Sequence, residues 1–334
     1  MKRVKAGKRG EVIKYISRAK AIRKLQLSLK DFRKLCILKG VYPREPPKKL
    51  KRTSKTYYHL KDVNFLATDP IIEKIRAQKV YTKKYKKAKS KGDIGKIQYL
   101  VKHKPNMSLN HLVRERYPEF IDALRDLDDP LSLMALFTIF PAHKEFNLTG
   151  DKIDLCAKLL KHFELYVIRS HALRKVFVSL KGIYYQAEIM DQKITYIVPF
   201  KYPADLPLDV DYRVMVTFLD FYLVMLKFVN FKLYSMLGLE YPPTEVDATT
   251  YQGYEIGKIQ GEKEDDRYKI DEEFREKEKS SENLLFSGLK FYLNTEVPRY
   301  SLEYVILACG GEVELENNDA SITHVITDRD NVKT

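Results

Sequence analysis

The sequence predicts a mainly α-helical N-terminal domain with an inserted β-hairpin, followed by a charged linker and a truncated C-terminal α/β domain. Apolar residues recur at spacings of three and four between residues 28 and 170, which is typical of amphipathic helices. From Arg174 to Phe200 the apolar residues alternate, as they do in strands. After Leu284, a strand pattern, a helix that opens with proline and two more strand patterns follow one another.

The N-terminal region is expected to begin with a flexible basic arm, because its first dozen residues include Gly7 and Gly10. Apolar residues at helical spacing predict a helix over 11–24. A second helix is predicted to begin after Ser28, whose side-chain oxygen can accept a hydrogen bond from a free amide of the first turn. Gly40 ends this helix, and the prolines that follow it predict an exposed loop.

A longer helix is predicted from Asp69-Pro70 to Lys91, since aspartate caps helices and proline fits their first turn. Its second half carries lysines on all sides. Glycines and prolines separate the segments that come next. Further helices are expected near 96–103, 108–117, 119–127, 130–140 and 151–170, the last being the most clearly amphipathic.

Alternating apolar residues predict a β-hairpin inside this helical domain. Its first strand begins at Arg174, and Gly182 is expected to mark a bulge within it. Residues 190–193 are predicted to form the turn into a second strand at 194–200.

The apolar stretch 212–237 is long enough to span a membrane. Charges interrupt it, however, and charges at the centre of a bilayer cost several kcal/mol. Arg213, Asp220 and Lys227 recur every seven residues, so they share one face of a helix. We therefore predict a largely buried helix and no membrane contact. Its polar stripe either binds a partner or, as we favour, forms an internal ion-pair network.

The C-terminal third changes character twice. Residues 244–283 mix many acidic with basic residues and contain few apolar ones, which predicts a linker. Strands are expected at 289–297, 312–316 and 322–327, with a helix at 298–309. Gly310 and Gly311 follow this helix and are predicted to form a structural turn.

Charge is distributed very unevenly along the chain. Residues 1–104 hold 33 Lys and Arg against seven Asp and Glu, a formal charge of +26 in a chain whose total is +15. Such an asymmetry favours a nucleic-acid or other polyanion partner, because each basic side chain at a phosphate releases counterions. The alternative is a solvated surface that serves nuclear import. The RNA-contacting candidates are Lys2, Arg3, Lys5, Lys8, Arg9, Arg18, Arg23, Lys24, Arg33, Lys34, Arg44, Lys48, Lys49, Lys51 and Arg52.

Patterns for catalysis or for cofactor and metal binding do not emerge from the sequence. Cys36, Cys156 and Cys309 lie far apart, which predicts neither a disulfide framework nor a metal site. The histidines show no paired spacing, and no set of nucleophile, histidine and acid is recognisable. We therefore expect no catalytic residues, no metal and no cofactor.

Several stretches resemble the pescadillo family of ribosome-biogenesis proteins, nearly continuously over residues 1–243. The matching stretches are 23–28, 31–37, 39–46, 115–118, 125–129, 174–182, 198–201 and 241–243. Residues 286–291, Gly310-Gly311 and 323–326 resemble the first half of a BRCT domain. The expected domains are a basic RNA-contacting segment at 1–55, the rest of the pescadillo domain at 56–243, a linker at 244–283 and the half BRCT domain at 284–334.

The resemblance implies a role, a place and partners. The role is that of a non-enzymatic assembly factor that binds 27S-type precursor rRNA and scaffolds proteins during processing near internal transcribed spacer 2. The place is the nucleolus and nucleoplasm. The partners are precursor large-subunit rRNA, the block-of-proliferation protein and a β-propeller protein in a trimeric complex, and other pre-ribosome proteins. The alternative function is a pure protein-interaction module whose basic arm only directs nuclear import.

Overall fold

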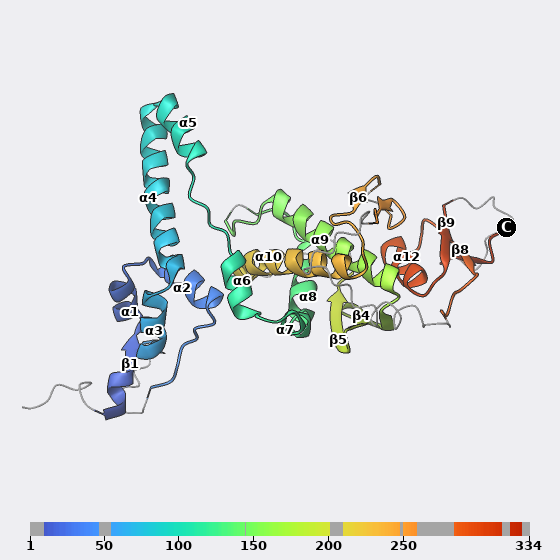
Figure 1. The fold of residues 1–334 in the computed structure, drawn as a ribbon, viewed down its shortest axis with the longest axis horizontal. Coiled ribbons are helices and arrows are strands. Elements are labelled where there is room, and N and C mark those ends of the chain that lie inside the picture. Colours follow the sequence, from blue (N-terminus) through green and yellow to red (C-terminus); the bar gives the residue numbers. More distant parts are fainter. Residues whose placement is uncertain are drawn as a thin grey trace, which may run out of the picture. The chain divides into compact units, whose positions relative to one another are not determined.

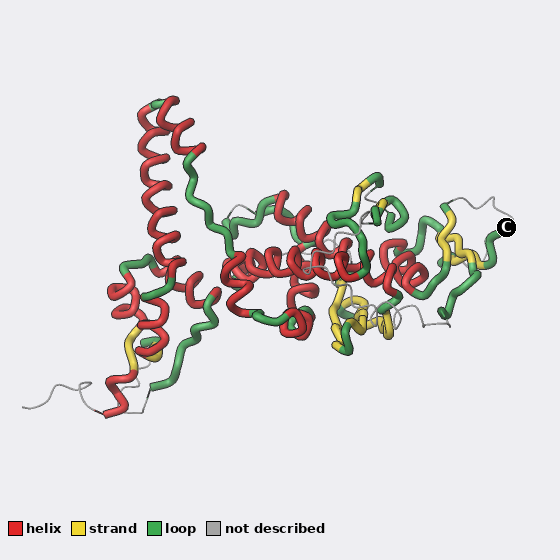
Figure 2. The backbone as a smooth tube through the Cα atoms, viewed as in Figure 1, coloured by secondary structure: helices red, strands yellow, loops and turns green. Residues whose placement is uncertain are grey.

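The computed structural model describes residues 10–46, 55–143, 145–200, 210–247, 250–258, 284–315 and 321–328. The chain divides into two compact units, the first with residues 1–116 and 211–221, the second with residues 117–210 and 222–334. Helices dominate the described residues, and the strands form small sheets (Figures 1 and 2). The prediction of a mainly helical N-terminal region is therefore confirmed.

The first unit is built from short helices, one long helix and a two-stranded sheet. Its elements are η1 (Gly10–Lys14), β1 (Tyr15–Ser17), α1 (Arg18–Leu25), α2 (Leu29–Leu38), β2 (Tyr57–His59), α3 (Leu60–Ala67), α4 (Pro70–Lys91), α5 (Ile94–Lys102) and α6 (Asn110–Arg116).

The predicted helix caps of the first unit are confirmed. The Ser28 hydroxyl accepts a hydrogen bond from the amide of Asp31 at 3.1 Å, at the start of α2. The Asp69 carboxylate accepts from the amide of Ile71 at 2.8 Å, at the start of α4. Gly92 ends α4 with a φ of +66°, a left-handed conformation that glycine adopts without strain.

The predicted helix over 11–24 is wrong in its first half. β1 pairs with β2 in antiparallel register, with Tyr15 opposite His59 and Ser17 opposite Tyr57, and α1 begins only at Arg18. Aromatic and β-branched residues favour a strand when a partner strand is present. That partner lies some forty residues away, so helical spacing within 11–24 could not reveal it.

The core of the first unit lies between α1, α2, α3 and the start of α4. Phe32 and Tyr58 are buried in it, with their ring centroids 5.2 Å apart in an edge-to-face arrangement. Ile71, Ile72 and Ile75 bury the first two turns of α4. Beyond them α4 extends away from α1 and α3, with α5 alongside it (Figure 1).

The second unit surrounds the helix α9 with further helices and with a three-stranded sheet. Its elements are α7 (Phe120–Arg125), α8 (Asp128–Phe137), α9 (Gly150–Ser170), β3 (Leu173–Ser179), β4 (Gly182–Ile189), β5 (Gln192–Val198), β6 (Thr244–Glu245), β7 (Tyr254–Glu255), β8 (Lys290–Leu293), α12 (Arg299–Ala308), β9 (Glu312–Glu314) and β10 (His324–Ile326). The helix α10 (Tyr212–Met236) starts in the first unit and ends in the second.

The predicted β-hairpin is a three-stranded antiparallel sheet of order β3-β4-β5. Gly182 is not a bulge: it pairs with Ser179 and begins β4 after a two-residue turn. A side chain there would meet the Cα of Pro199 at 2.7 Å, which explains the need for glycine. Met190 and Asp191 both have positive φ, as a type I′ turn requires between β4 and β5.

By length and composition α10 could cross a membrane. Its polar residues instead contact α9. The buried Asn230 amide donates a hydrogen bond to the carbonyl of Leu159 at 3.0 Å, and the Tyr234 hydroxyl donates to the carbonyl of His162 at 2.8 Å. These are the contacts of a core helix, in agreement with the prediction.

The last described segments form a parallel three-stranded sheet of order β10-β8-β9, with α12 packed against it. Gly310 follows α12 with a φ of +84°. A side chain on Gly310 would meet the Cβ of Leu284 at 2.7 Å, and one on Gly311 would meet the Cγ2 of Ile306 at 2.7 Å. Both glycines therefore permit close packing after α12.

Buried tyrosines and carboxylates hold α12 and the segment around Tyr251 to the rest of the second unit. We call Glu164, Tyr196, Tyr251, Glu303 and Tyr304 the Tyr251 network. The Tyr251 hydroxyl donates to Glu164 at 2.7 Å and its amide donates to Glu303 at 2.9 Å. The hydroxyls of Tyr196 and Tyr304 lie 3.0 Å apart. The predicted linker thus contains a buried tyrosine near its start, which the sequence analysis missed.

Candidate nucleic-acid interface

Nine of the predicted RNA-contacting residues lie outside the described residues. They are Lys2, Arg3, Lys5, Lys8, Arg9, Lys48, Lys49, Lys51 and Arg52. The remaining six, which all belong to the first unit, are Arg18, Arg23, Lys24, Arg33, Lys34 and Arg44.

Three of these six gather around β2, although they come from different segments. The backbone amide of Arg18 donates to Thr56 at 2.9 Å, and that of Arg44 donates to Tyr57 at 2.8 Å. Burial raises the pKa of Tyr58, and the nearby charges of Arg18 and Arg33 oppose this rise. The charges of Arg18 and Arg33 therefore both act on this residue of β2.

The other three candidates are Arg23, Lys24 and Lys34. Arg23 and Lys24 are exposed, whereas Lys34 is half-buried and forms an ion pair. Arg23 and Lys24 are exposed in the last turn of α1, and the Lys24 ammonium donates to the Asn64 amide oxygen. Lys34 on α2 lies 3.6 Å from the Asp220 carboxylate, so part of its charge is compensated. Arg23, Lys24, Arg33 and Arg44 are the exposed members of the set, and we call them the exposed candidates.

The polar stripe on α10 is not a continuous network in the described residues. Asp220 pairs with Lys34, as above. Arg213 and Lys227 are exposed on the same helix, and the structure does not show them in contact with Asp220. Partner binding by this stripe stays a prediction.

A second basic surface lies on α4 and α5, which the sequence analysis described as charged but did not single out. Residues 79–104 contain ten lysines and a single acidic residue, Asp93. All ten lysines are exposed, and none has an ion-pair partner within the part of the chain that the structure describes. The signal was present in the sequence, because Lys79, Lys83, Lys87 and Lys91 repeat every four residues.

Lys39, elsewhere in the first unit, is buried and paired with carboxylates, unlike the exposed lysines of α4 and α5. The Lys39 ammonium is buried, and it donates to the carboxylates of Asp69 and Glu115. Burial lowers the pKa of Lys39, but the hydrogen bonds and charges of the two carboxylates outweigh it, so the pKa is raised overall. Lys39 is thus a structural residue, whereas the ten lysines of residues 79–104 have no ion-pair partner among the described residues.

In the second unit, β3 exposes apolar side chains. It is an edge strand, since among the described strands it pairs only with β4. Phe177 and Val178 are 53% and 68% exposed, and the Phe177 ring stacks on Tyr184 at 5.1 Å. Open edges with apolar side chains favour the addition of another strand.

No metal-binding cluster is found among the residues that the structure describes. In this part of the chain, no three His, Cys, Asp or Glu side chains lie close enough together to hold an ion. Cys36, Cys156 and Cys309 do not form disulfides. Burial raises the pKa of Cys36 to about 12, so this thiol stays protonated near neutral pH.

Comparison with known proteins identifies what the chain is similar to. A family model described as Pescadillo N-terminus matches residues 5–277. A Pescadillo homolog of Nematostella vectensis is 42% identical, over 97% of this chain and 72% of the relative. Pescadillo of Danio rerio is 41% identical over 96% and 64%, and a homolog of Schizosaccharomyces pombe 39% identical over 99% and 67%. The chain therefore spans about two thirds of the length of the curated relatives it matches.

Proposed function

The chain belongs to the Pescadillo family, and from this membership we propose that it is a non-enzymatic assembly factor of the large ribosomal subunit that binds precursor rRNA. The observation that carries RNA binding is the charge of +26 in residues 1–104. The fold supports it by bringing basic residues of three segments to β2: the backbones of Arg18 and Arg44 bond to Thr56 and Tyr57, and the charges of Arg18 and Arg33 act on Tyr58.

The physical basis of this binding is electrostatic. RNA phosphates are recognised through shape and charge, and each neutralised phosphate releases counterions. Affinity should therefore fall steeply with salt. The full chain, bound to precursor rRNA that includes internal transcribed spacer 2, should lose at least about a thousandfold in affinity between roughly 50 and 200 mM salt.

Glutamine at all four exposed candidates, Arg23, Lys24, Arg33 and Arg44, tests the proposal. This variant should bind more weakly and with a shallower salt dependence than the parent chain. A matched control replaces four exposed lysines of the second unit, Lys175, Lys181, Lys193 and Lys232, and removes the same charge. Equal affinities for the parent chain and both variants, with weak salt dependence throughout, would refute RNA binding by this surface.

The finer parts of the proposal concern the partners, the place and the C-terminal segment. We propose a trimeric complex with the block-of-proliferation protein and a β-propeller protein, in the nucleolus and nucleoplasm. We also propose that residues 284–334 begin a BRCT domain. The parallel sheet of β8, β9 and β10 with α12, and the closely packed Gly310 and Gly311, support that assignment.

The second candidate function is a protein-interaction module. Its specific support is the open edge of β3, where a partner segment in extended conformation can add a strand and cover Phe177 and Val178. Main-chain hydrogen bonds would supply affinity, and the exposed apolar side chains would supply specificity.

Serine at both Phe177 and Val178 tests this second function. Capture of the block-of-proliferation protein by the full chain should fall at least about tenfold, since two apolar side chains leave the interface. Leu285→Ser is the control, because Leu285 is also exposed but lies outside the sheet. If both variants capture the partner as the parent does, the β3 edge is not its docking surface.

A further inference from the structure

We propose that the hairpin of α4 and α5 holds a single-stranded RNA segment along the lysines of α4 and an unpaired base in a hollow beside that helix. We call this element the α4–α5 hairpin, residues 70–107. The inference rests on the proposed RNA binding, but it assigns that binding to side chains outside the exposed candidates.

The first observation is a row of cations that winds slowly around α4. At 3.6 residues per turn, a spacing of four advances about 6 Å along a helix and about 40° around it. Lys79, Lys83, Lys87 and Lys91 therefore form a row about 18 Å long that turns by about 120° around α4. α5 packs beside α4, where Ala88 of α4 and Leu100 of α5 are buried.

The row is maintained against an energetic disadvantage. Like charges four residues apart on a helix repel one another and destabilise it. Three such pairs lie along the row, and no ion pair within the described residues offsets them. A phosphate backbone is the complementary partner that would remove this repulsion.

The base of α4 is fixed, so the row is a preformed surface. The Arg76 guanidinium donates to the carbonyl of Leu25 at 3.0 Å, and Ile71 and Ile72 are buried beside it. Tyr81 and Tyr85 stack at 6.0 Å on the half of α4 that extends beyond. On α5, the exposed Tyr99 ring stacks on His103 at 4.2 Å.

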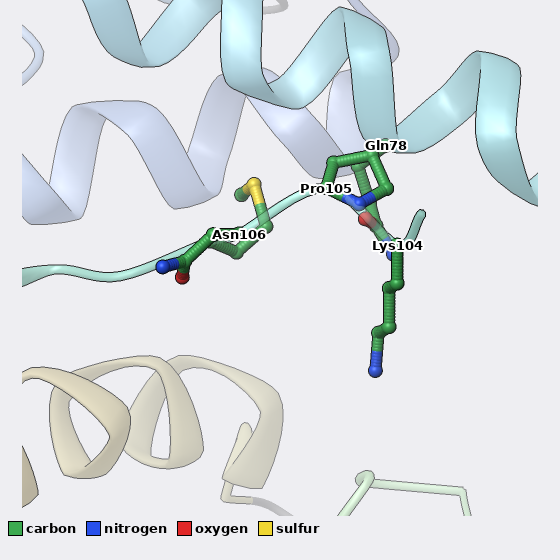
Figure 3. A pocket seen from close by; sticks show the side chains of 5 residues that line it. Gln78, Lys104, Pro105 and Asn106 are labelled. Carbon is green, nitrogen blue, oxygen red and sulfur yellow. The ribbon is translucent and has the colours of Figure 1, made fainter. Parts of the chain in front are cut away.

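The second observation is a hollow of about 480 Å³, which lies within the usual size range of ligand pockets. Gln78 of α4 lines it, together with Lys104, Pro105, Asn106 and Met107 of the segment that follows α5. Figure 3 shows Lys104 and Asn106 extending from that segment, with Gln78 behind Pro105.

One residue that lines the hollow, Gln78, carries a buried acceptor without a partner among the described residues. The Gln78 side-chain oxygen is buried and accepts no hydrogen bond from the described residues. A buried amide without a partner costs free energy, which a ligand donor would recover. The Asn106 side-chain oxygen already accepts from the amide of Ser108 at 2.9 Å, so its amide nitrogen is directed elsewhere as a donor.

An unpaired nucleobase fits this set of groups. Bases carry donors and acceptors side by side on their edges, and proteins read those edges only where the base is not paired. Gln78 would accept from the base, Asn106 would donate to it, and Lys104 would contact its phosphate. A duplex would offer phosphates to the lysine row but no base to the hollow.

Glutamine at Lys79, Lys83, Lys87 and Lys91 of the full chain tests the lysine row, because glutamine keeps the helix propensity of lysine. For a short single-stranded RNA, we expect the slope of log affinity against log salt to become shallower by about 3, roughly 0.7 per phosphate contact. The four-lysine variant of the second unit should keep the parent slope. An unchanged slope in the α4 variant overturns the inference.

Failure of this inference and failure of the proposed function give different results. If the variant of the exposed candidates loses affinity and the α4 variant does not, RNA binding stands and the hairpin has no part in it. If neither variant differs from the control, both are refuted.

Gln78→Ala tests the hollow, with far-UV circular dichroism to establish that α4 is intact. Affinity for the single strand should fall about tenfold relative to the affinity for a duplex of the same length, as for one lost hydrogen bond in a buried site. Asn106→Ala should give the same preference. An equal loss on strand and duplex, or no loss, would show that the hollow does not hold a base.

Discussion

The α4–α5 hairpin and the Tyr251 network differ in the surroundings of their charged groups: those of the hairpin are exposed, and those of the network are buried and hydrogen-bonded. In the network each carboxylate is buried and receives donors: Glu303 from the Tyr251 amide at 2.9 Å and Glu164 from the Tyr251 hydroxyl at 2.7 Å. On the hairpin, ten exposed lysines have no ion-pair partner among the described residues. Buried charges need partners within the fold, whereas exposed ones do not.

The contrast indicates which region serves stability and which serves a ligand. Removing a group from the network should leave a buried partner unsatisfied and destabilise the second unit. Removing a lysine from the hairpin should leave stability unchanged or slightly raised and affect only binding. The following substitutions test this division, from the largest expected effect to the smallest.

Glu303→Ala should have the largest effect. It leaves the Tyr251 amide and the Arg299 guanidinium without their acceptor in the interior, where Glu303 is fully buried. We expect the free energy of unfolding to fall by about 3 kcal/mol. Urea unfolding followed by circular dichroism measures it. The unfolding free energy of the control, Glu255→Ala at an exposed position, should stay within about 0.5 kcal/mol of the parent chain. A similar loss in both variants would show that the buried network contributes no more to stability than an exposed carboxylate does.

His162 of α9 should make the stability of the second unit depend on pH. Burial lowers its pKa to about 4 from the ordinary 6.5, although the charge of Glu245 opposes the shift and that of Lys158 adds to it. Because the unfolded chain takes up this proton at higher pH than the folded chain, stability should fall as the pH drops from about 6.5 to 4, by roughly 2–3 kcal/mol.

His162→Gln isolates this contribution, since glutamine does not titrate. The difference in unfolding free energy between the parent and the variant should be constant above about pH 7 and should change progressively below it. Tyr241 and Tyr254, whose rings pack against His162, are raised in pKa and stay neutral over this range. A difference that stays constant down to pH 4 would contradict the assignment to His162.

Two glycines with positive φ give an intermediate effect and compare the regions directly. Gly310→Ala combines strain at a φ of +84° with a contact to Leu284 Cβ at 2.7 Å, so it should cost about 2–3 kcal/mol. Gly92→Ala, at the end of α4, has a φ of +66° but open space around the new methyl group, and should cost about 1 kcal/mol. Thermal unfolding of both variants measures the two losses of stability. Equal losses would mean that the contact with Leu284 adds nothing to the backbone strain at Gly310.

Local signals in the sequence predicted the helices well. Ser28 and Asp69 cap α2 and α4 as expected, because a cap depends on the few residues next to it. The pairing of β1 with β2 and the burial of Tyr251 were missed, because both depend on residues far away in the chain. Met190 and Asp191 lie in the predicted turn, whereas Gly182 needed the position of Pro199 to be understood.

The candidate site was predictable to a similar degree. The excess of basic residues is visible in composition, and the four-residue lysine spacing is visible in the sequence. The gathering of Arg18, Arg33 and Arg44 around β2 follows from the missed strand pairing. The hollow beside Gln78 depends on where residues 104–107 pass α4, which no local pattern specifies. Contact of the predicted residues with RNA stays a prediction.

The smallest effect is expected from Lys83→Glu, and its sign is what matters. The substitution removes two repulsions, from Lys79 and Lys87, and adds two attractions, so α4 should gain about 0.8 kcal/mol at roughly 0.2 kcal/mol for each change. Hydrogen exchange of the α4 amides measures this local stability. RNA affinity should fall in the same variant, because an acidic side chain then interrupts the row.

A gain in helix stability together with a loss of affinity would show that the row is kept for a ligand at the expense of the fold. Lys83→Gln separates the two contributions, since it removes the repulsion without adding a negative charge. It should give about half of the stability gain and a smaller loss of affinity. If Lys83→Glu instead destabilised α4, the lysines would have partners within the protein, and the contrast with the Tyr251 network would not hold.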